Sequence, residues 1–238
     1  IDSILRYTHK GRIHSEINQL RSDQGGTVSG RLSYSNPNLQ QIPARNKEFG
    51  DKIRGLFLAE EGRQWGSFDY SQQEPRLVAH YAASVAKQFP GADEFIQAYE
   101  NEEADFHQIV ADMAGISRTQ AKTINLGLFY GMGKAKLAKE LGIDKDSAER
   151  LLITYNDRVP FVKKLAVEVT NSASKYGFIR TLKGRKCRFD MWEPSTFGMN
   201  KAMHYEEAKA IYGNNIRRAY TYKALNRLIQ GSAADQTK

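Results

Sequence analysis

Residues spaced four apart in the middle of the chain could hold a nucleotide. Arg118, Lys122, Leu126 and Tyr130 would form one slowly drifting stripe if this segment is helical. The stripe runs from two cations through an apolar side chain to an aromatic ring, which suits a molecule with phosphates at one end and a base at the other. The alternative is an ordinary amphipathic helix with solvated cations and a buried apolar face. The spacing therefore indicates a nucleoside triphosphate site, to be weighed against the rest of the chain.

A second stretch carries carboxylates that could bind a metal ion. Residues 68–76 read Phe-Asp-Tyr-Ser-Gln-Gln-Glu-Pro-Arg. We expect Asp69 at the end of a strand and Glu74 near the start of the next helix, where Pro75 is tolerated in the first turn. A carboxylate at a strand end is held rigidly and can reach solvent, as a magnesium ligand requires. An isolated aspartate at this place could also simply cap the helix.

The elements around these residues suggest a small sheet into which a long helical segment is inserted. Residues 22–47 are rich in turn formers, and 53–58 and 64–70 are expected to be strands because of aromatic residues such as Trp65. From Gln73 the apolar periodicity becomes helical. Further helices are expected at 92–100, 104–114, 117–130, 134–141, 145–155 and 160–176, then a hairpin at 177–188 and a last helix from about 203 onward.

Composition limits the class of protein. Lys plus Arg exceed Asp plus Glu by 35 to 27, giving a net charge of +8, which favours an anionic partner such as nucleic acid without choosing between DNA, RNA and a lipid surface. The apolar stretches are too short to cross a bilayer, so we expect a soluble chain. The single cysteine, Cys187, has no partner thiol and is expected to be a packing residue, in keeping with a reducing cytosol.

Several stretches together resemble one polymerase family. Asp-Tyr-Ser-Gln-x-Glu-x-Arg at 69–76 is similar to motif A of the family A DNA polymerases, and Arg-x-x-x-Lys at 118–122 followed by Tyr-Gly at 130–131 looks like their motif B. Residues 29–33, 37–43 and 226–235 agree as well. The resemblance covers the whole chain and implies an α+β, mostly helical fold that forms part of a polymerase right hand. It implies the end of the thumb and a connector at 1–28, part of the palm at 29–80, the fingers at 81–220 and a return to the palm at 221–238.

The resemblance also implies the roles of individual residues around the nucleotide. Asp69 would be catalytic and would bind Mg²⁺ together with the backbone of Tyr70, in a site for two ions. Glu74 would occupy the space of a ribose 2′-hydroxyl and so exclude ribonucleotides. The triphosphate would be held by Arg118, Lys122 and His107. Lys122 would also be a catalytic residue.

Further implied contacts involve the base pair and the DNA. Leu126 and Tyr130 would face the nucleotide, and Tyr130 with Gly131 would lie where the nascent base pair stacks. The minor groove or template would be contacted by Arg31, Asn226 and Gln230. The chain departs from the family pattern at Leu126, where the best-known members have Phe or Tyr, and this predicts altered discrimination against sugars that lack the 3′-hydroxyl.

The family's second metal-binding aspartate belongs to a His-Asp-Glu motif beyond the helix that contains Asp235, which is itself expected to be structural. We therefore expect a chain truncated before that motif and inactive alone, or one completed by a second polypeptide. The leading hypothesis is the polymerase segment of a phage-like, template-directed DNA polymerase that uses primer-template DNA, deoxynucleoside triphosphates and Mg²⁺ in the cytoplasm. The alternatives are a non-catalytic nucleic-acid-binding module of the same fold and a single-chain RNA polymerase relative, the latter opposed by Glu74.

Overall fold

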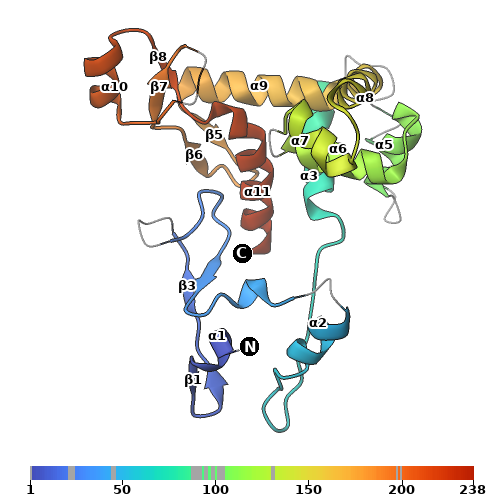
Figure 1. Ribbon diagram of the computed structural model, residues 1–238, viewed down its shortest axis with the longest axis vertical. Helices are drawn as coiled ribbons and strands as arrows, with labels where there is room; N and C mark the ends of the chain where they lie inside the picture. The colour runs from blue at the N-terminus through green and yellow to red at the C-terminus, as the bar shows by residue number, and fades with distance from the viewer. Residues whose placement is uncertain are drawn as a thin grey trace. The chain divides into compact units, whose positions relative to one another are not determined.

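The computed structural model of the chain consists of two compact units. It describes residues 2–20, 25–43, 47–86, 93, 96–97, 100, 105–129, 132–196, 198 and 200–238. The first unit comprises residues 1–71 and the second residues 72–238, and each is described by itself (Figure 1). Within the described residues, none of the helices is both long enough and apolar enough to cross a membrane.

The first unit contains short strands and helices. They are α1 (Asp2–Leu5), β1 (Thr8–His9), β2 (Arg12–Ile13), β3 (Glu16–Asn18), β4 (Ser33–Ser35), the 3₁₀ helix η1 (Leu39–Gln41) and α2 (Lys47–Arg54). β1 pairs with β2, and β3 pairs with β4 in an antiparallel register that sets Ile17 opposite Tyr34. The predicted loop region before residue 47 therefore contains only short regular pieces, as its turn-forming composition indicated.

The strands predicted at 53–58 and 64–70 do not form. α2 extends to Arg54, and residues 55–70 contain turns and irregular backbone but no strand. The side chains of Trp65 and Phe68 are 74% and 97% exposed. Aromatic residues favour a strand only where a neighbouring strand supplies hydrogen bonds and a surface for packing, and no described strand pairs with this segment. Asp69 therefore lies in an exposed irregular segment and not at a strand end, which corrects the prediction.

The second unit is mainly helical. Its helices are α3 (Gln73–Ala86), α5 (Phe106–Ala114), α6 (Arg118–Phe129), α7 (Lys134–Leu141), α8 (Lys145–Arg158), α9 (Pro160–Tyr176), α10 (Tyr205–Tyr212), the 3₁₀ helix η2 (Thr221–Lys223) and α11 (Ala224–Thr237). Its strands are β5 (Phe178–Arg180), β6 (Lys186–Arg188), β7 (Trp192–Pro194) and β8 (Ile216–Arg218). The α+β, mostly helical class is thus confirmed, and most predicted helices match within a few residues. The helix predicted at 92–100 lies largely outside the described residues.

The single helix predicted from residue 203 onward is wrong. α10 ends at Tyr212 and is followed by the C-cap Gly213, whose φ of +59° suits glycine; the chain then forms β8 before α11 begins. β8 pairs antiparallel with β7, so that Arg218 lies opposite Trp192. This pairing with a distant segment overrides the local helical pattern.

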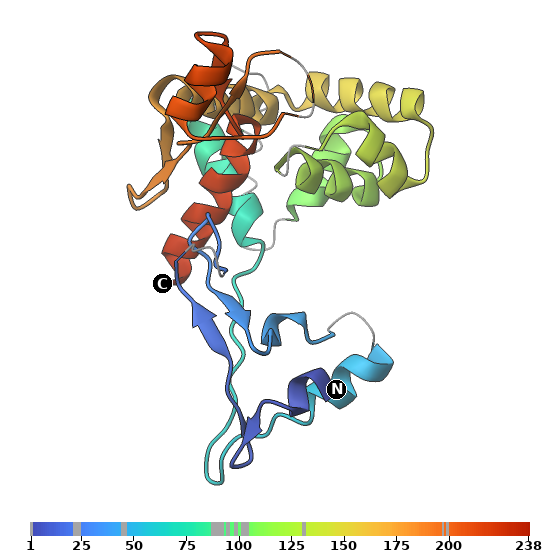
Figure 2. The same ribbon diagram turned by 60° about the vertical axis from the view of Figure 1, so that its left-hand side comes forward.

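One hydrophobic core joins the helices of the second unit. α9 packs on α3 and α11, α5 packs on α6, and α7 packs on α8 (Figures 1 and 2). The largest fully buried side chains include Phe106, Ile124, Tyr155 and Phe161. Because these residues come from α5, α6, α8 and α9, the core fixes the helices that carry the predicted nucleotide contacts.

Candidate nucleotide site

The predicted phosphate-binding cations lie together on the exposed side of α6. Ser117 and Gln120 form a reciprocal capping box, in which each side chain accepts the other residue's backbone N–H at 3.2 and 3.0 Å. This cap starts the helix at Arg118, so Arg118 and Lys122 are one turn apart, and both are exposed. The apolar side of the helix contributes Ile124 to the core.

Arg118 is held in place by Asp105, the residue that caps α5. Its Nε and Nη2 both lie close to Asp105 Oδ2, at 2.8 and 2.7 Å. The other oxygen, Oδ1, accepts the backbone N–H groups of His107 and Gln108. Burial raises the pKa of Asp105, but the Arg118 hydrogen bond and the two N–H groups outweigh it, so the pKa lies below its ordinary value. Asp105 is therefore a charged anchor that orients Arg118.

His107 is a buried member of a chain of hydrogen bonds. Tyr155, which is fully buried, donates its hydroxyl to Asn125 Oδ1, and Asn125 Nδ2 lies 3.3 Å from His107 Nδ1. An amide nitrogen can only donate, so Nδ1 accepts and the ring proton of neutral His107 is on Nε2. Burial lowers the pKa of His107, Asp105 opposes this, and the charges of Lys122 and Arg118 lower it further. His107 is thus a neutral imidazole whose Nε2–H can donate.

The N-termini of α3, α5 and α6 are joined by hydrogen bonds. Gln72, directly before α3, accepts the backbone N–H of Phe106 at the start of α5 at 3.1 Å. Asp105, directly before α5, holds Arg118 at the start of α6. Helix N-termini carry partial positive charge and favour anions. These bonds link the first turn of α3, which contains the half-buried Glu74, to the helices that carry His107 and Arg118.

The other predicted nucleotide and metal residues are placed less completely. Leu126 lies in α6, but its side chain is not among those that the structure describes, and Tyr130 and Gly131 fall outside the described residues. In the first unit, Asp69 and Tyr70 are exposed. Among the described residues, no group of three or more His, Cys, Asp or Glu side chains could hold a metal ion.

The predicted DNA contacts belong to both units. Arg31 is exposed in the loop before β4, while Asn226 and Gln230 are half-buried and one turn apart on α11. The Nδ2 atom of Asn226 is buried and finds no hydrogen-bond acceptor among the described residues. A hydrogen bond from Asn226 Nδ2 to DNA therefore requires the side chain to rotate. Asp235, also on α11, is occupied by Arg185 and Thr181, as suits a structural residue.

Sequence reasoning missed the residues that hold this site together. Asp105, Asn125, Tyr155 and Gln72 were not singled out. For Asn125 a signal existed, because it follows Ile124 on the buried side of α6, where a polar residue needs a partner. Nothing in the local sequence marks Tyr155 as that partner, because the two residues are 30 positions apart.

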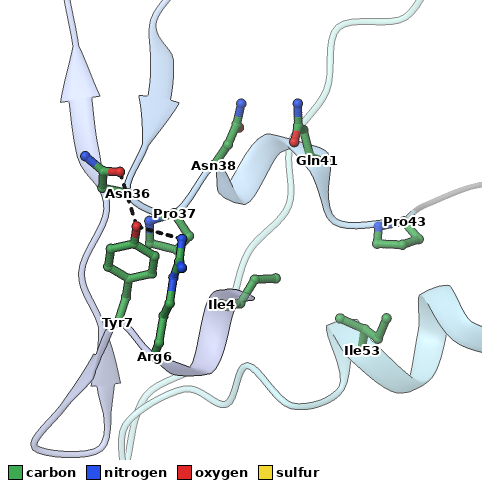
Figure 3. A pocket seen from close by; sticks show the side chains of 9 residues that line it. All are labelled: Ile4, Arg6, Tyr7, Asn36, Pro37, Asn38, Gln41, Pro43 and Ile53. Atoms are coloured by element: carbon green, nitrogen blue, oxygen red, sulfur yellow. Dashed lines mark hydrogen bonds between the residues drawn. The ribbon is translucent and has the colours of Figure 1, made fainter. Parts of the chain in front are cut away.

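The first unit has a hollow of its own, apart from the predicted site residues. Its volume is about 430 Å³, and Figure 3 shows its lining, which is Ile4, Arg6, Tyr7, Asn36, Pro37, Asn38, Gln41, Pro43 and Ile53. Tyr7 donates its hydroxyl to Asn36 Oδ1, and Arg6 donates to the Tyr7 oxygen, both at 3.2 Å. These bonds partly satisfy the polar side of the hollow.

Two exposed cations, a neutral imidazole and linked helix N-termini thus lie close together on a mostly helical α+β framework, an arrangement that would suit an anionic ligand. The chain belongs to DNA polymerase family A, which matches residues 1–238. It is 38% identical to a DNA-directed DNA polymerase of Pseudomonas phage M6 over 99% of the chain, and 32% identical to the thermostable DNA polymerase I of Thermus aquaticus over 98% of it.

A solved structure agrees with this assignment. The POL domain of Pol1 from M. smegmatis, in complex with DNA primer-template and dNTP, is similar to 98% of the chain with a TM-score of 0.71 and 31% identity. The fold is therefore part of a polymerase fold. The chain spans 39% of the phage M6 polymerase, 25% of the Thermus aquaticus enzyme and 38% of the solved chain.

Proposed function

We propose that this chain is the polymerase segment of a template-directed DNA polymerase, which binds a deoxynucleoside triphosphate and primer-template DNA for transfer to a primer 3′-hydroxyl. The observation that carries the proposal is the exposed pair Arg118 and Lys122, one turn apart on α6 beside the neutral His107. Family membership and the DNA primer-template and dNTP bound in the M. smegmatis structure support it.

Arg118 and His107 of the second unit suit a triphosphate because their hydrogen bonds already orient them before it binds. Arg118 is already oriented by Asp105, so fewer of its side-chain rotations are lost when a phosphate arrives. His107 offers Nε2–H without a positive charge of its own, and Lys122 supplies a mobile point charge. Together with the helix N-termini they would stabilise the negative charge of the phosphates.

Glu74, Leu126 and Tyr130 are proposed to select the nucleotide. Glu74 would fill the space of a ribose 2′-hydroxyl, and Leu126 and Tyr130 would face the sugar and base. Tyr130 and Gly131 would contact the terminal base pair, and Arg31, Asn226 and Gln230 the DNA near the primer end.

The magnesium site is proposed from the chemistry of its donors. The carboxylate of Asp69 and the backbone carbonyl of Tyr70 are hard oxygen ligands of the kind that Mg²⁺ prefers, and Asp69 is exposed. When bound, Mg²⁺ would neutralise phosphate charge in a two-metal arrangement. The family pattern has two metal-binding aspartates, and Asp69 is the only one of them that it places in residues 1–238. We therefore expect a polypeptide of these residues alone to extend a primer poorly, unless a second polypeptide supplies the second aspartate.

The proposed subdomains are the end of the thumb at 1–28, part of the palm at 29–80, the fingers at 81–220 and a return to the palm at 221–238. The site of action would be the cytoplasm, that of the host if a phage encodes the chain. The similarity to phage polymerases supports a phage origin.

Titration of the chain with a fluorescent dNTP and Mg²⁺ tests the proposed function. Lys122→Ala should weaken triphosphate binding roughly 10-fold or more, as expected for the loss of a charge-assisted hydrogen bond. Lys139→Ala, which removes an exposed lysine of α7, should leave that binding unchanged. Affinity for a primer-template duplex, and its dependence on salt, should be the same in both variants.

The outcomes separate the candidates. If Lys122→Ala weakens duplex binding in parallel with triphosphate binding, the α6 cations contact DNA instead. If the parent binds DNA but no triphosphate, the chain is a non-catalytic nucleic-acid-binding module.

A further inference from the structure

The β5–β6 hairpin presents a cationic face that the nucleotide site does not use. In its register Arg180 lies directly opposite Lys186, and Arg188 lies opposite Phe178. These residues share one side of the hairpin because the intervening Ile179 and Cys187 are buried in the core.

The charged side chains in the hairpin segment are all positive. Residues 175–188 contain six Lys or Arg and no Asp or Glu. Arg185 is paired with Asp235, whereas Arg180, Lys186 and Arg188 form no ion pair with any residue in the described part of the chain. The nearest carboxylate in sequence is Asp190, just beyond β6.

Such an arrangement costs stability in the free protein. Like charges directly opposite each other on antiparallel strands repel. Part of this repulsion is offset by the ring of Phe178, which lies 5.5 Å from the Arg180 guanidinium and 4.7 Å from the Lys186 ammonium, and by the Gly184 carbonyl, which accepts a hydrogen bond from Arg180 Nη1 at 3.0 Å. An anionic partner would remove the repulsion.

The hairpin is rigidly attached to α11. Arg185 donates to Asp235 at 2.7 Å and to the Gly231 carbonyl at 3.0 Å, and the backbone N–H of Leu182 in the turn donates to Ser232 Oγ at 3.0 Å. Both strands lie beside α11, as the two views agree (Figures 1 and 2). The cations therefore sit on a fixed support, so a partner would not have to order the hairpin.

We propose that the hairpin face of Arg180, Lys186 and Arg188 binds the sugar-phosphate backbone of nucleic acid. Lys186 and Arg188 are two residues apart along β6, about 6.8 Å at the usual rise of a strand, a spacing that suits successive phosphates of one nucleic acid strand. The half-buried Phe178 ring on the same face offers a surface on which a base can stack. An aromatic ring among cations favours nucleic acid over an acidic protein surface.

This inference rests on the proposed function, because it adds a DNA contact to the same chain. The hairpin packs against α11, the helix that carries the proposed template-contacting residues Asn226 and Gln230.

Salt-dependent binding of the chain to a labelled duplex and to a single strand tests the inference. The variant is Arg180→Gln/Lys186→Gln/Arg188→Gln. The matched control is Lys139→Gln/Lys145→Gln/Lys163→Gln, which removes the same charge from exposed positions of α7, α8 and α9. Each lost phosphate contact lowers the slope of log K against log salt by roughly 0.9 for duplex and roughly 0.7 for single strands.

Three lost contacts predict a clear difference from the parent. Between 50 and 200 mM salt the parent should lose about 40-fold more affinity for duplex than the hairpin variant, or about 20-fold more for a single strand. The control should keep the parent's slope. Because the substitutions relieve repulsion, the hairpin variant should also have an unchanged or higher Tm, which shows that it folds.

Equal slopes for the parent and the hairpin variant would overturn the inference while leaving the proposed function intact. An equal decrease in the control would overturn it too, since net charge would then be the cause. A parent that binds no DNA but binds poly-glutamate would refute both the inference and the proposed function.

Discussion

Replacing Tyr155 with phenylalanine tests whether the hydrogen-bond chain to His107 is part of the site. The hydroxyl is fully buried and donates to Asn125 Oδ1, and Asn125 is also fully buried. Burial raises the pKa of Tyr155, so the hydroxyl remains protonated and can donate at neutral pH. Its removal leaves the Asn125 oxygen without a partner in a dry environment, which costs about 1–3 kcal/mol.

Urea denaturation measures that cost as the free energy of unfolding. Tyr155→Phe should lower it by about 1–3 kcal/mol, and the control Tyr176→Phe, at a residue that is 58% exposed, should change it by less than about 0.5 kcal/mol. A loss no greater than that of the control would refute the assigned hydrogen bond.

A second readout separates positioning from packing. ¹⁵N NMR of the His107 ring should show the proton on Nε2 in the parent and a mixture of tautomers in Tyr155→Phe, because the Asn125 amide is no longer fixed. Triphosphate affinity should fall in the same variant, while duplex affinity should not. If Tyr155→Phe kept the His107 tautomer, the triphosphate affinity and the duplex affinity of the parent, the hydrogen bonds from Tyr155 through Asn125 to His107 would be structural only.

Three further predictions concern His107, Glu74 and Leu126. Because the folded pKa of His107 lies below its ordinary value of 6.5, the unfolded state takes up the proton first, so this residue's contribution to stability should decline as pH falls below about 6.5. Urea denaturation at pH 7 and 5 should show a smaller decline in His107→Gln, and an equal decline would contradict the assignment. In a chain competent for primer extension, Glu74→Ala should raise ribonucleotide incorporation at least 10-fold, and no rise would remove its role in excluding the 2′-hydroxyl. In the same assay Leu126→Tyr should change the ratio of dideoxynucleotide to deoxynucleotide incorporation, and an unchanged ratio would reject its role at the sugar.

The helices were predictable because their signals are local. Asp144 caps the start of α8, and the C-cap Gly177, which has a φ of +76°, follows the last residue of α9. The cationic spacing of Arg118 and Lys122 is likewise readable from the sequence, since it depends only on α6 being a helix.

The strands and the supporting residues of the site were not predictable in the same way. Residues 55–70 have a strand-like composition, but pairing depends on a distant partner. β8 interrupts a helical pattern because β7 pairs with it. The roles of Asn125 and Tyr155 arise from burial between α6 and α8, which no spacing within either helix reveals.

The central claim is that Arg118, Lys122 and His107 hold the triphosphate of a nucleotide, and that Asp69 binds a metal ion. A crystal structure of the chain with a dideoxy-terminated primer-template, a dNTP and Mg²⁺ tests it directly. We predict phosphate oxygens within hydrogen-bonding distance of the Arg118 guanidinium, the Lys122 ammonium and His107 Nε2, and a metal ion bound by the Asp69 carboxylate. A triphosphate bound away from α6, or an Asp69 carboxylate that binds no metal ion, would contradict the account.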